Sequence, residues 1–150
     1  MSNIKLIVSE IDGVLTKGYS PTDELGNVLF KNYYTSDFEA INKLKELGFI
    51  IVFISSDNAI NYNLCRKKNI PFYWAKADKI SVLSSVLMRY NVTADETIYV
   101  GSKLSDIPCM RMVPLSYCTN ELLGFNSFYT KAGEGIFTEL YLKLIKENIC

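Results

Sequence analysis

Two acidic residues one position apart follow an apolar segment near the amino terminus. Positions 6–8 are continuously apolar, as in a strand that is buried on both faces of a parallel sheet. Glu10 and Asp12 come at the carboxyl end of this segment. In a strand of period two these positions point the same way, so we expect the two carboxylates to converge. Because such a pair repels unless a cation or a shared proton lies between them, it indicates a metal site or a nucleophile beside an acid/base. A strand end whose acids only cap the next turn would produce the same pattern.

Two further polar segments stand where a strand is expected to end or a helix to begin. Ser55 and Ser56 follow the apolar run 49–54, where they could cap the next helix or bind an anion at its amino terminus. Lys79 opens a predicted helix, a position where the helix dipole opposes a cation. That placement hints at function, although a surface lysine would look the same.

Strand-like and helix-like segments alternate along the chain. Such βαβα alternation predicts an α/β fold, Rossmann-like, with three αβα layers and a mostly parallel sheet. We expect one domain over residues 1–150. Ser102 and Asp106 follow the fourth strand, and with the earlier polar residues they should lie at one rim of the sheet. In detail, strands are expected around 6–8 and at 49–54, 71–74, 97–101 and 115–118. The first helix is expected to start within 35–39, where Ser36 and Glu39 are spaced as a capping box, and to end at Gly48.

Residues 18–34 interrupt this alternation. Two short strand-like runs surround an Asp-Glu-Leu-Gly-Asn turn, which predicts a β-hairpin arm. The arm carries more apolar and aromatic side chains than an isolated hairpin can cover, so we expect it to pack on another subunit or back on its own domain. These side chains are Tyr19, Leu25, Val28, Phe30, Tyr33 and Tyr34.

Composition excludes several classes of protein. Sixteen Lys and Arg balance sixteen Asp and Glu, so no overall field attracts nucleic acid or a membrane surface. We see no signal peptide and no apolar run of membrane-spanning length, and we expect a cytoplasmic protein. Four scattered cysteines and no histidine make structural zinc and histidine-based catalysis improbable, and the thiols should be reduced.

Over essentially its whole length the chain resembles the haloacid dehalogenase superfamily. The resemblance is to the capless 3-deoxy-D-manno-octulosonate 8-phosphate phosphatase family and to relatives that act on nonulosonate 9-phosphates. It implies a capless haloacid dehalogenase fold with the hairpin arm, a Mg²⁺-dependent phosphatase site and a homotetramer. It rests on Ile-Asp-Gly-Val-Leu-Thr-Lys-Gly at 11–18, the arm, Thr35-Ser36-Asp37, Ser55, Asp78-Lys79, Tyr99-Val-Gly101 with Asp106, and Gly133-Glu134-Gly135 with Glu139.

The resemblance also implies roles for single residues. Asp12 matches the acid/base and Lys79 the cation that stabilises the phosphate. Ser55, with Ser56 beside it, matches the phosphate-binding hydroxyl. The metal positions fall on Glu10, Asp12, Ser102 and Asp106, and contacts with substrate or another subunit on Asp37, Gly133 and Glu134.

Two positions depart from the family pattern. Glu10 stands where the nucleophilic aspartate is expected. Its extra methylene displaces the carboxylate by more than about 1 Å, and misplacement on that scale can cost about 100-fold in rate. Ser102 replaces a metal-binding aspartate, although Mg²⁺ demands hard oxygen ligands in near-ideal geometry. Lys103 could place an ammonium at the metal position.

A second resemblance is to the carboxy-terminal domain of animal-type CMP-sialic acid synthetases, which has lost the nucleophile and serves tetramer assembly. It rests on the motif Val-Ser-x-Ile-Asp-Gly-x-Leu-Thr at 8–16 and Gly-x-x-x-Ser-Asp at 101–106. The two resemblances together predict a phosphatase-like protein of sugar-acid metabolism, sialic acid or octulosonate, with little or no activity. It would act as an oligomerisation or regulatory module, with a nucleotide-sugar synthetase as a further candidate partner. The alternatives are an active Mg²⁺-dependent phosphatase with Glu10 as nucleophile, and sugar-phosphate binding without turnover.

Overall fold

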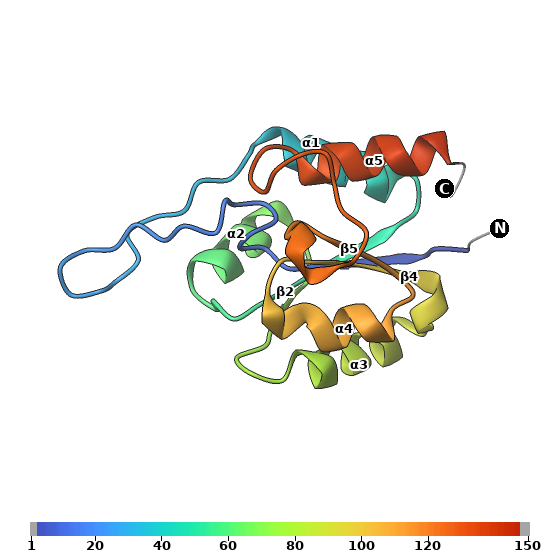
Figure 1. The fold of residues 1–150 in the computed structure, drawn as a ribbon, viewed down its shortest axis with the longest axis horizontal. Helices are drawn as coiled ribbons and strands as arrows, with labels where there is room; N and C mark the ends of the chain where they lie inside the picture. The colour runs from blue at the N-terminus through green and yellow to red at the C-terminus, as the bar shows by residue number, and fades with distance from the viewer. Residues whose placement is uncertain (1–2, 148–150) are drawn as a thin grey trace.

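A computed structural model describes residues 3–147. Five parallel strands form one sheet in the order β3-β2-β1-β4-β5, with helices on both faces, so the Rossmann-like three-layer prediction is confirmed (Figure 1). The strands are β1 (Leu6–Ser9), β2 (Ile50–Ser55), β3 (Phe72–Trp74), β4 (Thr97–Gly101) and β5 (Leu115–Cys118). The helices are α1 (Ser36–Glu46), α2 (Ile60–Lys68), α3 (Lys79–Tyr90), α4 (Ile107–Met112) and α5 (Ile136–Lys146), with short 3-10 turns at Ala94–Glu96, Leu104–Asp106 and Glu121–Leu123.

The sheet divides the hydrophobic core into two layers by the alternation of its side chains. On β1, Ile7 faces the layer under α1, α2 and α5, while Leu6 and Val8 face the layer under α3 and α4. All three are completely buried, because β1 lies at the centre of the sheet between β2 and β4. The carboxyl ends of β1, β2 and β4 therefore lie side by side at one rim, where loops carry the polar residues.

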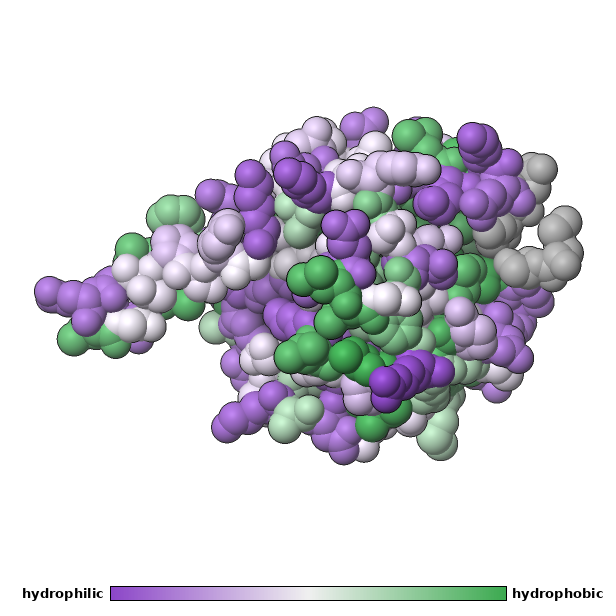
Figure 2. Space-filling view, in the orientation of Figure 1, coloured by the Kyte–Doolittle hydropathy of each residue, from purple (hydrophilic) through white to green (hydrophobic). Residues whose placement is uncertain are grey.

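The arm at residues 18–34 projects away from the sheet (Figure 1). Only one antiparallel bridge, between Thr22 and Val28, joins its two limbs, so it is a hairpin loop and not the pair of short strands expected. Pro21 has no N–H to donate, and Asp23 Oδ1 accepts from the amides of Leu25 and Asn27, which takes these groups out of a ladder. Apolar side chains lie exposed along the arm, among them Leu25 at 81% (Figure 2).

Other local expectations are corrected or completed. The first helix has Thr35 at its cap with no side-chain capping bond, so the predicted box between Ser36 and Glu39 is wrong. Cys65, Cys109 and Cys118 are buried free thiols, and Cys150 lies outside the described residues. None of the helices within residues 3–147 combines the length and the apolar character that a membrane crossing requires.

Candidate active site

A buried lysine joins two buried carboxylates at the carboxyl rim of the sheet. Glu10 follows β1 directly, and its amide still bonds to the Val100 carbonyl of β4 at 2.9 Å. Lys79 Nζ donates to Glu10 Oε2 and, at 2.8 Å, to Asp106 Oδ1. The Glu10 and Asp106 side chains are fully buried, and that of Lys79 is nearly so. Lys79 takes this place because it is the first residue of α3, whose amino terminus is capped by Asp78.

The three charges of this cluster shift one another's pKa values. Burial alone would lower the pKa of Lys79, but the Glu10 and Asp106 carboxylates outweigh it and raise that pKa. Burial likewise works to raise the pKa of Asp106, yet Lys79 and the neighbouring amides hold it below its ordinary value. For Glu10 the effect of burial, which raises its pKa, is larger than the opposing effects of Lys79 and Lys103, so the pKa of Glu10 is raised. The cluster is therefore held by charge pairing in which Glu10 is the least compensated member.

Asp106 is held by four donors. Its Oδ1 accepts from Lys79 and from the Tyr99 hydroxyl at 2.8 Å. Its Oδ2 accepts from the backbone amides of Ser102 and Lys103 at 2.9 Å each. Asp106 thus fixes the loop after β4 and has no oxygen left open.

Asp12 belongs to a second cluster, built around the arm. Its Oδ2 accepts from Lys31 Nζ at 2.8 Å and from Asn61 Nδ2 at 2.9 Å. Lys31 also pairs with Asp57 Oδ2 at 2.7 Å, and its side chain is only 5% exposed. Burial on its own would lower the pKa of Lys31, but the hydrogen bonds that its ammonium donates to Asp12 and Asp57 outweigh burial and raise it. The returning limb of the arm is therefore tied to the rim of the sheet through a lysine between two acids.

The two acids of the opening motif thus do not converge as expected. Glu10 pairs with Lys79, whereas Asp12 pairs with Lys31. The reason is that β1 ends at Ser9, so Asp12 already lies in a turn and the period-two argument does not reach it. Gly13, at φ +85°, continues this turn, and it lies so close to Ser102 that a Cβ would meet the hydroxyl at 2.7 Å.

Ser102 and Lys103 contact two oxygens that a metal ion would need, the Asp12 carbonyl and Glu10 Oε1. The Ser102 hydroxyl donates to the backbone carbonyl of Asp12 at 2.9 Å. Lys103 Nζ lies 3.8 Å from Glu10 Oε1, the oxygen that Lys79 does not take. Within residues 3–147 no group of three or more His, Cys, Asp or Glu side chains could hold a metal ion. The donor set of Glu10, Asp12, Ser102 and Asp106 therefore does not fit Mg²⁺, which requires several open oxygen ligands at about 2.0–2.1 Å.

Ser55 and Ser56 lie at the end of β2 as predicted. Ser55 is completely buried, and its Oγ accepts from the Asp57 amide at 3.1 Å and from Asn61 Nδ2 at 2.9 Å, so it fixes the turn after β2. Ser56 lines an open pocket of about 590 Å³ together with Asp12, Lys31 and Lys103. Asp57 also lines this pocket, and Lys31 is paired with both Asp12 and Asp57. Lys103 and Ser56 are therefore the lining donors that could bind an anion.

The residues expected to contact substrate or another subunit have separate positions. Asp37 is completely buried, and its Oδ1 accepts from the amides of Phe137 and Thr138 at the start of α5, so it ties α1 to α5 from inside. Gly133, at φ +74°, donates its amide to the Val14 carbonyl. Glu134 is exposed, and for it a contact role stays a prediction.

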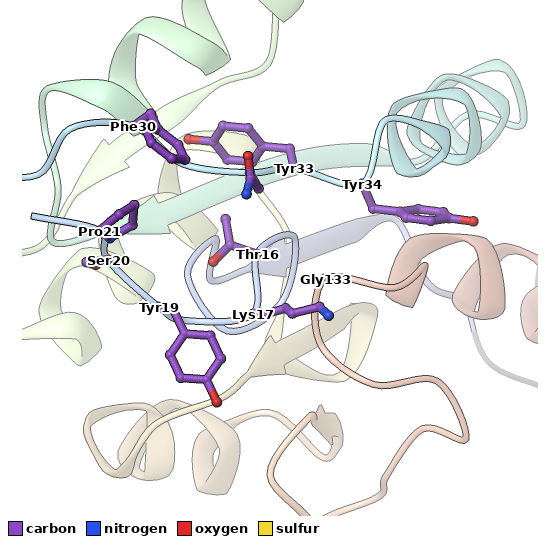
Figure 3. A pocket seen from close by; sticks show the side chains of 10 residues that line it. Thr16, Lys17, Tyr19, Ser20, Pro21, Phe30, Tyr33, Tyr34 and Gly133 are labelled. Carbon is purple, nitrogen blue, oxygen red and sulfur yellow. The ribbon is translucent and has the colours of Figure 1, made fainter.

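A second pocket, of about 630 Å³, lies at the base of the arm. Aromatic side chains from both limbs of the arm line it, together with Thr16, Lys17 and Gly133 (Figure 3). None of the residues in the buried ion pairs of Glu10, Asp12 and Asp106 lines it.

Sequence reasoning missed Lys31, Asn61 and Tyr99 as residues of this site. Lys31 stands among aromatic residues of the arm, and Asn61 lies in the first turn of α2 with its side chain completely buried. Tyr33 donates to Asn61 Oδ1 at 2.8 Å and so extends the same cluster. The sequence signal was a polar residue within an apolar or helical segment, as at Lys31 and Asn61. That signal does not identify Asp12 as the residue that they contact.

Comparisons with known proteins were made for the whole chain. No protein-family model matches it. The curated KdsC phosphatase of Haemophilus influenzae, which acts on 3-deoxy-D-manno-octulosonate 8-phosphate, is 24% identical over 148 residues, covering 93% of this chain and 82% of the relative. The cobalt-bound structure of the enzyme from this organism has a TM-score of 0.87 at 24% identity, over 96% of this chain and 88% of that one.

Two further structures extend the likeness. A hydrolase from Legionella pneumophila assigned to the haloacid dehalogenase superfamily, subfamily III A, has a TM-score of 0.88 at 26% identity, over 98% of this chain and 85% of that one. The octulosonate 8-phosphate phosphatase of Moraxella catarrhalis, in complex with a magnesium ion, phosphate and KDO, has a TM-score of 0.87 at 20% identity, over 99% and 90% of the two chains. These likenesses confirm the predicted fold and the resemblance to KdsC-like phosphatases.

The same likenesses support the active-phosphatase alternative better than the prediction of a silent protein, since the curated relative is a phosphatase. The predicted loss of activity and the homotetramer stay predictions. So does the resemblance to CMP-sialic acid synthetase domains. The bound cobalt and magnesium ions belong to the related structures from Haemophilus influenzae and Moraxella catarrhalis.

Proposed function

Because this chain is a haloacid dehalogenase-superfamily protein similar to the KdsC-like phosphatases, we propose that it binds a phosphorylated sugar acid at the carboxyl rim of its sheet and turns it over slowly or not at all. The ligand would be of the octulosonate 8-phosphate or nonulosonate 9-phosphate type. The phosphoryl group would lie in the pocket beside Lys103, with Ser56 as a further donor. Ser55 is completely buried behind this pocket and would support it through its bond to the Asp57 amide.

One observation carries the slow turnover. The Ser102 hydroxyl bonds to the Asp12 carbonyl, and the Lys103 ammonium stands against Glu10 Oε1, so two oxygens expected to bind Mg²⁺ already face proton donors. Without a metal to neutralise the phosphoryl oxygens, attack by a carboxylate is unfavourable, since much of the catalysis of phosphoryl transfer is electrostatic.

An active phosphatase is the second candidate, and the known activity of the curated relative favours it. In that reaction a Glu10 oxygen would form a bond to phosphorus while the bond to the sugar-acid oxygen breaks, and Asp12 would give that oxygen its proton. Water would then attack the phosphorus and release phosphate from Glu10, with Asp12 taking the proton of the water. The side chain of Lys103 is 41% exposed and would have to swing out of the site.

The two candidates are separated by measuring binding and turnover on the same protein. We expect calorimetry to detect octulosonate 8-phosphate binding, and phosphate release to stay at the level of buffer with or without Mg²⁺. Lys103→Met should weaken binding about tenfold, because a charge-assisted contact contributes about 1.5–3 kcal/mol, part of which water replaces. The exposed Lys76→Met is the matched control.

Two results would decide against this proposal. Mg²⁺-dependent phosphate release that Glu10→Gln abolishes would establish the phosphatase. Failure of the natural protein to bind either inorganic phosphate or the sugar-acid phosphates would remove ligand binding altogether.

Assembly with further copies of the chain is a role that the arm supports. Tyr19, Leu25 and Leu29 are more than half exposed on a segment that projects from the domain (Figure 2). Exposed apolar side chains gathered on one extended segment are typical of an interaction surface. We propose a homotetramer, within which the domain would serve assembly or regulation, with a nucleotide-sugar synthetase as a candidate partner.

A further inference from the structure

We infer that Lys103 is the resident cation of this site: its ammonium takes the place of a divalent metal beside Glu10, so that the carboxyl rim of the sheet is complete without one. The inference deepens the proposed function and rests on the same site. It concerns the charge of the protein itself and can be tested with no sugar phosphate present.

The first argument is the sharing of the Glu10 carboxylate. Its Oε2 is taken by Lys79, which also serves Asp106. Its Oε1 accepts from the Ile11 amide at 3.2 Å and faces Lys103 Nζ at 3.8 Å. Each oxygen of this fully buried carboxylate thus has its own lysine, and the second lysine comes from the loop after β4.

The second argument is the way in which residue 103 is held. Its backbone amide donates to Asp106 Oδ2 at 2.9 Å, next to the amide of Ser102 at the same distance. The Ser102 hydroxyl, in turn, donates to the Asp12 carbonyl. The loop that carries the ammonium is therefore fixed at three points, which positions Lys103 over Glu10.

The third argument is the balance of charge. Four carboxylates at this rim, those of Glu10, Asp12, Asp57 and Asp106, face three lysines. The lysines are Lys31, Lys79 and Lys103. Loss of the Lys103 ammonium would leave Glu10 Oε1 facing only an amide, and a hard divalent cation is the natural replacement at a carboxylate. Because Lys103 also lines the open pocket, a cation could enter from solvent there.

The test is a titration with Mg²⁺ and with Co²⁺, followed by calorimetry and by thermal unfolding. The natural protein should show no shift in its unfolding temperature with either ion or with a chelator. Ser102→Asp should bind Mg²⁺ weakly, because the added carboxylate competes with the ammonium. Ser102→Asp with Lys103→Met should bind at least tenfold more tightly than Ser102→Asp alone, and Ser102→Asp with Lys103→Arg should not.

Three outcomes would overturn the inference. The first is a natural protein that already binds Mg²⁺ as tightly as the Ser102→Asp, Lys103→Met variant. The second is equal binding by Ser102→Asp with and without Lys103. The third applies if the double variant does not fold, in which case the single variants decide. Lys103→Met alone should be less stable than the exposed control Lys76→Met, and adding Glu10→Gln should restore its stability. Equal stability of Lys103→Met and Lys76→Met would refute the role. None of these results depends on sugar-phosphate binding, so failure here and failure of the proposed function remain distinct.

Discussion

Removal of the Lys79 ammonium should be among the most damaging single changes in this protein. Lys79→Met keeps the length and the apolar stem of the side chain but leaves two fully buried carboxylates without their shared partner. Breaking a buried ion pair from one side typically costs about 3–5 kcal/mol. Asp106 keeps the Tyr99 hydroxyl and two amides, so the loss falls mainly on Glu10. We therefore expect the lower end, about 3 kcal/mol.

That loss is large against a typical domain stability of about 5–15 kcal/mol. It corresponds to a fall in unfolding temperature of about 6–12 °C for a chain of this length. Urea unfolding followed by circular dichroism and by the fluorescence of Trp74, the only tryptophan, measures it. Lys76→Met changes a neighbouring exposed lysine in the same way and should stay within about 0.5 kcal/mol of the natural protein.

The pH dependence of the effect follows from Glu10. Its pKa is already raised in the folded protein by burial, and loss of Lys79 raises it further. A carboxyl whose folded pKa exceeds its unfolded pKa binds its proton more tightly when folded, so its contribution is favourable at low pH and is lost as pH rises through the folded pKa. Lys79→Met should therefore be closest to the natural protein in acid and fall behind toward neutral pH.

Two results would refute this reasoning. A loss below about 1 kcal/mol would place the Lys79 pairs in the range of exposed ion pairs. A loss that Glu10→Gln fails to reduce in the Lys79→Met background would show that the unpaired Glu10 charge is not its cause.

Two other predictions concern Asp37 and the arm. Burial raises the pKa of Asp37 from 3.8 to about 6, and its Oδ2 has no hydrogen-bond partner among the described residues. Ionisation of this carboxyl should therefore lower the free energy of unfolding by up to about 3 kcal/mol as pH rises from about 4 to about 6.5. Chemical unfolding of Asp37→Asn should lack this fall, and parallel pH curves for the two proteins would contradict the prediction. Deletion of residues 20–29 should reduce the molar mass in light scattering, because it removes the exposed Leu25 and Leu29, and a natural protein that is monomeric at micromolar concentration would end the assembly proposal.

The sequence by itself was sufficient for the fold and for the location of the site. Positions 6–8 are apolar at every residue because β1 is covered on both faces, and this pattern is local. Parallel strands must place their carboxyl ends at one rim, so Glu10, Ser55, Lys79 and Asp106 were expected there from their order alone. The replacements at Glu10 and Ser102 are likewise visible without coordinates.

Only the tertiary structure decided which of these groups pair. Lys31 meets Asp12 across 19 positions and Asn61 meets it across 49, and neither pairing leaves a local pattern. Asp37 looked like a contact residue but caps α5 across 100 positions, because packing of α1 on α5 carries its carboxylate to that helix. Periodicity determines which face of an element a residue occupies. The partner of a charged side chain depends instead on how elements distant in sequence pack together. At this rim that packing pairs Asp12 with Lys31 and Glu10 with Lys79.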